Sequence, residues 1–250
     1  MNSQFLKFLL ATIFLGYASL RDIEEREVSD KVWILGVPAC LALTFLDMSF
    51  GEVDPMFLLA SLLISFVLGV VLCHFGFYGG ADAKALLLVA AAFPPYPLET
   101  GSSMVKFFPT PFLLVFFSST LISIVFPLTV LTLNSIDILR GLNPLRNVKV
   151  ENVFKRLILL ATVRRVPFET LRRSLKYFPA EKLVEEEGKI WRKPLFFVHA
   201  ETDVNKLVQE LEKHKDLFID GVLASPTIPM IAFLFCGFVL SYLTVSFIRM

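Results

Sequence analysis

Residues 76–84 read Gly-Phe-Tyr-Gly-Gly-Ala-Asp-Ala-Lys and interrupt a strongly apolar chain. Asp82 follows three small residues, and apolar segments lie on both sides of it. An ionisable side chain at the edge of a hydrocarbon layer is costly and usually has a functional reason. We therefore expect the chain to be organised around this acidic turn.

The composition is that of a membrane protein. The chain has 250 residues, of which 55% are hydrophobic, and its mean hydropathy is +0.68, far above that of an ordinary soluble domain. The net charge of +1 gives no reason to expect a nucleic-acid partner. Cys40, Cys73 and Cys236 lie in apolar runs without a CxxC pair, so we expect neither a metal site nor a cofactor.

A helix needs about 20 mainly apolar residues to cross a bilayer. Six segments approach this requirement, and they cover about 3–20, 32–46, 55–75, 83–93, 109–133 and 228–248. The fourth segment is short and is followed by Pro94, Pro95 and Pro97. Lys7 is expected to extend to a lipid headgroup. The sequence predicts an α-helical polytopic membrane protein with six transmembrane helices and a small α+β cytoplasmic domain inserted before the last helix.

The loop charges predict the orientation. Residues 21–31 contain the basic residues Arg21, Arg26 and Lys31, whereas all the charged residues of 47–54 are acids. Of the 24 Lys and Arg, 17 lie in residues 134–227. Because short cytoplasmic loops carry the excess positive charge, both termini are expected outside the cell. Asp22 and Asp82 then lie on the same cytoplasmic face, where they can converge. The predicted domains are a membrane domain (1–134), a cytoplasmic domain (135–225) and the sixth helix (226–250).

The predicted cytoplasmic domain carries two basic segments with helical periodicity, residues 152–165 and 168–177. Such a surface either attracts anionic headgroups of membrane lipids or is a solvated helix face. Residues 193–200 and 217–224 have the pattern of strands. Between them, Thr202 or Asp203 can cap a helix that runs to about His214.

Taken by position alone, the two acids allow more than one interpretation. Asp22 can be an exposed loop acid that pairs with Arg26, and Asp82 can be an N-terminal cap of the fourth segment. Two facing carboxyl groups also support hydrolysis, in which one takes a proton from water and the other protonates a carbonyl oxygen. Such a pair shares one proton and titrates as a unit. Gly79 and Gly80 would let a peptide backbone approach Asp82 closely.

The residues around both acids resemble those of a known family. Gly79-Gly80-Ala81-Asp82 is similar to the Gly-x-hydrophobic-Asp motif of the GxGD-type intramembrane aspartyl proteases. Lys84, two residues after the acid, resembles the prepilin-peptidase version of this motif. The stretch from Asp22 through Arg26 to Asp30 resembles the first aspartate motif of the same group. The resemblance covers roughly the first 95 residues and implies that Asp22 and Asp82 are catalytic.

The absence of CxxC pairs and the extra domain before the last helix make the chain more similar to archaeal preflagellin peptidases than to bacterial prepilin peptidases. This resemblance implies an aspartic endopeptidase of the cell membrane that removes the short basic leader of preflagellins or type IV pilin-like precursors at the cytoplasmic face. The acids of the first loop are candidates for attracting the basic leader: Glu24, Glu25, Glu27 and Asp30. Lys84 can either ease the ionisation of Asp82 or extend to a headgroup.

Two alternatives remain open at this point. A prepilin-type peptidase for other pilin-like substrates would share the same motifs. A non-enzymatic transporter or assembly scaffold would also place acids near helix breaks, but more often at mid-membrane depth.

Overall fold

The structure, a computed structural model, describes residues 3–94, 111–148, 150, 152–173, 176–186, 189–195 and 204–248. The chain divides into two compact units. The helical unit consists of residues 1–123 and 229–250, and the mixed unit consists of residues 124–228.

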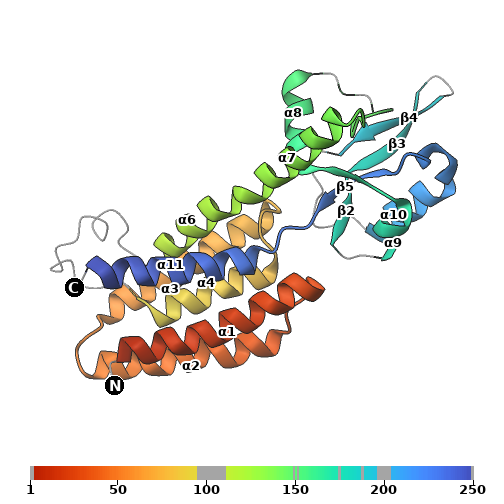
Figure 1. The fold of residues 1–250 in the computed structure, drawn as a ribbon. Helices are drawn as coiled ribbons and strands as arrows, with labels where there is room; N and C mark the ends of the chain where they lie inside the picture. The colour runs from red at the N-terminus through yellow and green to blue at the C-terminus, as the bar shows by residue number, and fades with distance from the viewer. Residues whose placement is uncertain are drawn as a thin grey trace. The chain divides into compact units, whose positions relative to one another are not determined.

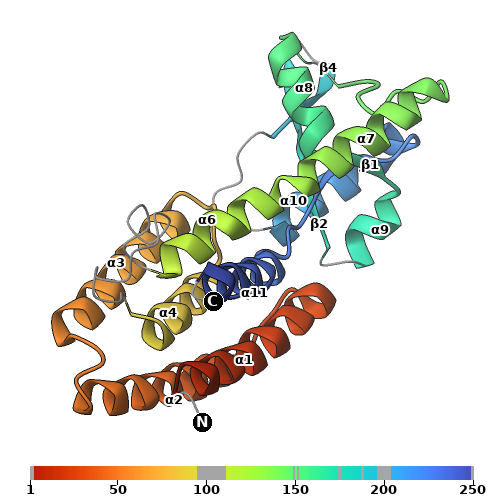
Figure 2. The same cartoon turned by 60° about the vertical axis from the view of Figure 1, so that its left-hand side comes forward.

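The helical unit contains helices that run side by side (Figure 1); these are α1 (Ser3–Glu25), α2 (Asp30–Ser49), α3 (Pro55–His74), α4 (Gly80–Ala92), α6 (Pro111–Ser123) and α11 (Met230–Ile248). The short helix α4 contacts all five others and lies at the centre of the unit (Figure 2). Its side chains after Lys84 are nearly all buried. A helix that is apolar all round belongs in a core, so the turn that carries Asp82 begins the most enclosed helix of the unit.

Small residues set the position of the first turn of α4. A Cβ added at Gly69 in α3 would lie 2.9 Å from the Cβ of Ala83. The two helices therefore cross where a larger residue than glycine would push them apart, in the manner of small-residue packing between membrane helices. Because Ala83 follows Asp82 directly, this crossing also fixes the place of the acid.

Four helical segments are long and apolar enough to cross a membrane among the residues that the structure describes, and Met230–Thr244 is a shorter apolar helix; the four are Ser3–Glu25, Asp30–Ser49, Pro55–His74 and Pro111–Leu139. The fold is thus mostly helical with four candidate spans. The helices differ from the expected segments in three places. The first helix continues past residue 20 to Glu25, the fourth begins at Gly80, and the fifth is divided at Ile124 into α6 and α7 (Val125–Leu139). Of the prolines expected to end the fourth segment, Pro95 and Pro97 lie outside the described residues.

Lys7 does not extend outward as expected for a lysine that reaches a lipid headgroup. Its side chain is fully buried, and its Nζ lies 2.6 Å from Oδ2 of Asp47 in α2. The hydroxyl of Ser3 donates a hydrogen bond to the other carboxylate oxygen. A buried charge is retained when an opposite charge and hydrogen bonds compensate it, and here this pair joins α1 to α2 at the end of α1 far from Asp22.

The mixed unit contains two small antiparallel sheets. In the first, β5 (Val222–Pro226) lies between β1 (Arg164–Val166) and β2 (Tyr177–Pro179), and in the second, β3 (Glu181–Glu186) pairs with β4 (Lys189–Pro194). The accompanying helices are α7, α8 (Val153–Thr162), α9 (Phe168–Arg173), α10 (Val204–Lys213) and a 3-10 turn at Lys215–Phe218. The expected mixture of helices and strands is confirmed.

Local boundaries in this unit differ from the expectations. The helix expected over residues 168–177 is shorter, because α9 covers only Phe168–Arg173. Tyr177 already belongs to β2, which pairs with β5. The strand expected over 217–224 begins only at Val222, after the 3-10 turn. The strand expected over 193–200 ends at Pro194 within β4, and residues 196–203, with the expected Thr202 or Asp203 cap, lie outside the described residues.

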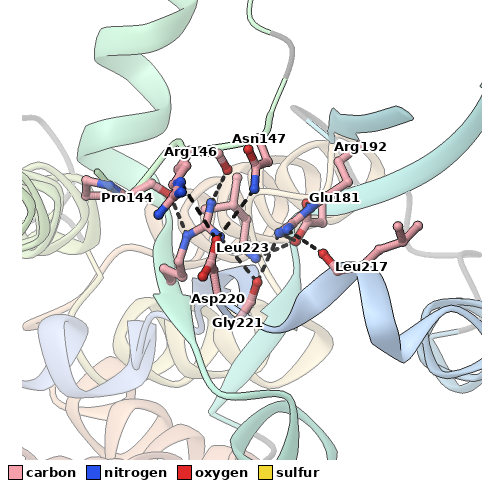
Figure 3. Close-up of polar contacts among 10 residues, drawn as sticks. Pro144, Arg146, Asn147, Glu181, Arg192, Leu217, Asp220, Gly221 and Leu223 are labelled. Atoms are coloured by element: carbon pink, nitrogen blue, oxygen red, sulfur yellow. Dashed lines mark hydrogen bonds and ion pairs between the residues drawn. The ribbon is translucent and has the colours of Figure 1, made fainter. Parts of the chain in front are cut away.

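A buried ionic network joins the two sheets (Figure 3). Arg192 donates to both carboxylate oxygens of Glu181, at 2.8 and 2.7 Å, and to the backbone carbonyls of Leu217 and Gly221. Glu181 also accepts from the Leu223 amide at 2.7 Å. Every charged group in this pair has partners, so the network ties the β3–β4 hairpin to β5 in one geometry.

Candidate functional site

Asp22 lies in the last turn of α1 and not in the following loop. Arg26 ends the helix in the left-handed region with φ 59°, and its amide donates to the Asp22 carbonyl at 3.3 Å. This turn places the Arg26 guanidinium over the acid, with Nη1 4.0 Å from Asp22 Oδ1. The side chains are mostly buried, at 13% exposure for Asp22 and 16% for Arg26.

Asp22 is also held by α11, which is distant in sequence. The amide of Ile231, in the first turn of α11, donates to Asp22 Oδ2 at 3.1 Å. The first amides of a helix have no partner within the helix, and the helix dipole favours a negative charge there. A cation on one side and a helix N-terminus on the other therefore offset part of the cost of burying a charge on Asp22.

Burial lowers the pKa of the Arg26 guanidinium from its ordinary value, and the carboxylate of Asp22 opposes this shift. An arginine keeps its charge in either case. Two of its nitrogens, Nε and Nη1, are buried and have no hydrogen-bond partner within the described residues. The electrostatic attraction to Asp22 is thus the principal compensation that the described residues offer this buried cation.

Asp82 is the third residue of α4, and Gly79 is the residue that precedes the helix. The Gly79 amide donates to Asp82 Oδ2 at 2.8 Å, which is the reaching-back half of a capping box. Asp82 is therefore not the N-cap residue expected from the sequence: Gly79 takes that place, and Asp82 caps the helix start from its third position through one carboxylate oxygen. A Cβ added at Gly80 would meet no atom within 4 Å, so the backbone before Asp82 is open on that side.

Both acids lie in the helical unit, Asp22 near the end of α1 and Asp82 near the start of α4, and these two helices contact each other and α11. Among the described residues no hydrogen bond joins them; each accepts from a backbone amide instead. Each carboxyl group is thus oriented by a backbone amide that binds one of its oxygens.

Lys84 and the acids of the first loop have partners of their own. Lys84 Nζ lies 2.6 Å from Asp30 Oδ1, so the lysine that follows Asp82 pairs with the first residue of α2. Arg21 pairs with Glu25 at 2.7 Å on the exposed surface of α1. Glu24 and Glu27 are likewise exposed. The candidate leader-binding acids thus line the solvent side of the α1–α2 connection, and Asp30 is engaged within the protein.

Sequence reasoning did not identify two groups at this site. One is the Ile231 amide, whose only signal in the sequence is a helix start after Pro229, without any indication of which acid it would meet. The other is Tyr78, four residues before Asp82, which is buried and has its ring centroid 6.1 Å from that of Phe116 in α6. Gly79, Gly80 and Ala81 are the residues expected to support the site through their backbone. Gly79 precedes α4, and Gly80 and Ala81 are its first two residues, so the three form the helix start that carries Asp82.

The fold and the site define a class: a mostly helical protein with four candidate membrane spans and an aspartate near the end of each of two contacting helices. Residues 9–128 match the type IV leader peptidase family. This part of the chain, which holds both aspartates, is similar to that family and makes up a little less than half of the 250 residues.

Two curated relatives are similar to the chain. The preflagellin peptidase of Methanococcus voltae is 30% identical over 128 residues, which is 48% of this chain and 54% of the relative. The preflagellin peptidase of Methanocaldococcus jannaschii is 26% identical over 151 residues, which is 56% of this chain and 61% of the relative. The chain therefore spans little more than half the length of these relatives.

Proposed function

We propose that this chain is a membrane aspartyl endopeptidase that removes the short basic leader of preflagellin-like or type IV pilin-like precursors. The single observation that carries the proposal is that two aspartates, each held by a backbone amide, lie at the ends of the contacting helices α1 and α4 within the region that matches the type IV leader peptidase family. The names of the relatives, both preflagellin peptidases, support preflagellin-like precursors as the first substrates to test.

The surroundings of the two acids suggest different roles for them. Asp22, beside the Arg26 guanidinium and the Ile231 amide, is the carboxylate that takes a proton from water. The water oxygen then attacks the carbonyl carbon of the scissile peptide bond. Asp82, which has no cation at comparable distance among the described residues, is the protonated acid that gives its proton to the carbonyl oxygen. When the tetrahedral intermediate collapses, the C–N bond breaks, the proton on Asp22 passes to the departing amine, and Asp82 takes back a proton from a hydroxyl of the intermediate.

The substrate would approach along the open side of the turn before Asp82, where Gly80 leaves space. A basic leader would be drawn to the exposed acids Glu24, Glu25 and Glu27. A leader lysine or arginine could also replace Lys84 as the partner of Asp30, because this pair is largely exposed and therefore weak. Reversing the charge of the three glutamates should raise KM for a basic leader and reduce the salt dependence of cleavage, and unchanged kinetics would remove this part of the proposal.

The proposed placement puts the multi-pass chain in the cell membrane with six crossings, the site toward the cytoplasm and both termini outside. Supporting it, the C-terminal end of α1 and the N-terminal end of α11 meet at Asp22, so these two helix ends lie on one face. The excess of Lys and Arg in residues 134–227 is on the same side in this arrangement.

The function is tested with purified protein and a preflagellin-like precursor in detergent, by following loss of the leader. Wild-type protein should cleave, whereas Asp22→Asn and Asp82→Asn should each lose at least about a thousandfold in kcat/KM, as expected when a group that transfers a proton in the transition state is removed. Glu52→Gln, an exposed acid in the α2–α3 connection, is the matched control and should retain full activity. Full activity in either aspartate variant would refute the dyad. Absence of cleavage of any pilin-like precursor by the wild type would favour a scaffold or transporter.

A further inference from the structure

Helix α8 of the mixed unit exposes an apolar stripe made of Val153, Phe154, Leu157 and Ile158. Their exposed fractions are 83%, 68%, 53% and 37%. The opposite side of the helix is buried, with Leu159 only 1% exposed in a core cluster with Val163 and Leu223. An exposed contiguous apolar patch of this kind marks a surface that contacts either another protein or a membrane.

The helix is fixed in place, so its stripe cannot turn inward. The Asn134 side chain of α7 donates to the carbonyls of Leu160 and Val163 at the end of α8, at 2.7 Å each. Arg164, just beyond α8, pairs with Asp137 of α7 at 2.8 Å. These bonds satisfy the last carbonyls of α8 and pin it to α7 within the same unit (Figure 1).

The helix to which α8 is attached is itself apolar. α7 forms the second part of the candidate span Pro111–Leu139. At 1.5 Å per residue, 29 helical residues are longer than the hydrocarbon core of roughly 30 Å, so the segment has residues to spare for the interface. Asn134 and Asp137 show that the C-terminal end is the polar one, because they hold α8 there.

Two cations border the stripe. With about 100° per residue around a helix, the stripe covers roughly 140°, from Val153 to Ile158. Lys155 lies about 60° beyond Ile158, and Arg156 lies about 60° before Val153. Both side chains are exposed. An exposed apolar stripe bordered by Lys and Arg is the pattern of a helix that lies in the plane of a membrane interface.

We propose that α8 binds the lipid interface: its apolar stripe enters the boundary between headgroups and acyl chains, and Lys155 and Arg156 contact the phosphates of anionic phospholipids. Continuity with the candidate span and the charge at both borders favour a lipid surface over a protein partner. The mixed unit is thereby held on the bilayer by a second contact beside α7. This inference does not depend on the proposed peptidase activity.

The test uses the full chain reconstituted into phosphatidylcholine vesicles, with and without phosphatidylglycerol. Phe154→Trp adds an indole to the stripe, and Ile219→Trp adds one at a position of the same unit that is 89% exposed and lies outside α8. Each variant is compared with its parent, which carries Trp33 and Trp191. Lipids brominated near the top of the acyl chain should quench the added emission at position 154 several-fold more than at position 219.

The headgroup part is tested with Lys155→Glu combined with Arg156→Glu, in the Phe154→Trp background. Quenching should fall in vesicles with phosphatidylglycerol, and the difference between the two vesicle types should shrink. Lys182→Glu, an exposed lysine on β3, is the control and should leave both unchanged. Equal quenching at positions 154 and 219 would overturn the proposal. So would an indole at 154 that is shielded from both brominated lipid and aqueous iodide, which would indicate a protein contact.

Discussion

Removing Arg192 should destabilise the mixed unit by an amount that the structure allows us to estimate. The Arg192→Met variant leaves Glu181 fully buried without its guanidinium partner, and within the described part of the chain the Leu223 amide is its one remaining donor. The carbonyls of Leu217 and Gly221 lose a donor at the same time. Breaking one partner of a buried ion pair costs about 3–5 kcal/mol.

This loss is measurable as hydrogen exchange of the full chain in detergent, followed by mass spectrometry of peptides that contain β5. Since every 1.4 kcal/mol is a factor of ten, the expected loss accelerates exchange at the Leu223 amide by about a hundredfold to a few thousandfold. Peptides of the helical unit are the internal reference and should exchange at the parental rate.

The double variant Arg192→Met with Glu181→Leu is the decisive comparison. Replacing both charges by apolar side chains removes the uncompensated carboxylate, so it should be less damaging than the single change. A double-mutant cycle then gives the coupling between the two residues. Acceleration of less than tenfold in Arg192→Met, or a double variant that is worse than the sum of the single ones, would refute the assignment of this network as a stabilising link between the sheets.

Three further predictions concern the helical unit. Arg26→Gln removes the cation beside Asp22 and makes protonation of that acid easier, so the acidic limb of the pH–activity profile should move to higher pH by roughly one unit; an unchanged profile would exclude Arg26 from this role. Asp82→Asn keeps an oxygen that can accept the backbone amide and should unfold like the parent, whereas Asp82→Ala should lose about 1 kcal/mol of stability; both should be inactive, and equal stability of the two variants would argue against the cap. Lys7→Met should lose about 3–5 kcal/mol in denaturant unfolding, and adding Asp47→Leu should restore most of it; a double variant no better than the single one would contradict a buried pair.

The sequence predicted the helical class and the presence of a mixed unit because both depend on composition and periodicity. It predicted the position of Asp82 at a helix start because glycine followed by an acid is a local signal. The end of the first helix was placed at about residue 20, whereas α1 continues to Glu25. Apolar content marks where a segment can lie in hydrocarbon, but a helix continues into the polar region for as long as its side chains permit.

Long-range partners could not be predicted in the same way. Lys7 and Asp47 are 40 residues apart and pair because α1 and α2 pack side by side. The Ile231 amide reaches Asp22 over a separation of 209 residues, and a backbone donor has no residue type by which to recognise it. The pairing of Asp30 with Lys84 is similar, since each residue alone fits a solvated loop equally well.

The two interpretations of Asp82, as a helix cap and as a catalytic acid, turn out to be compatible. The cap occupies Oδ2 through the Gly79 amide, which fixes the side-chain rotamer and directs the other oxygen elsewhere. Asp22 is held in a corresponding way through its Oδ2 by the Ile231 amide. A pair of acids that must share a proton and position a water needs one oriented oxygen from each. Backbone amides are suitable for this orientation because they are neutral, so they hold each carboxyl group in both of its protonation states while Arg26 supplies the asymmetry between the two acids.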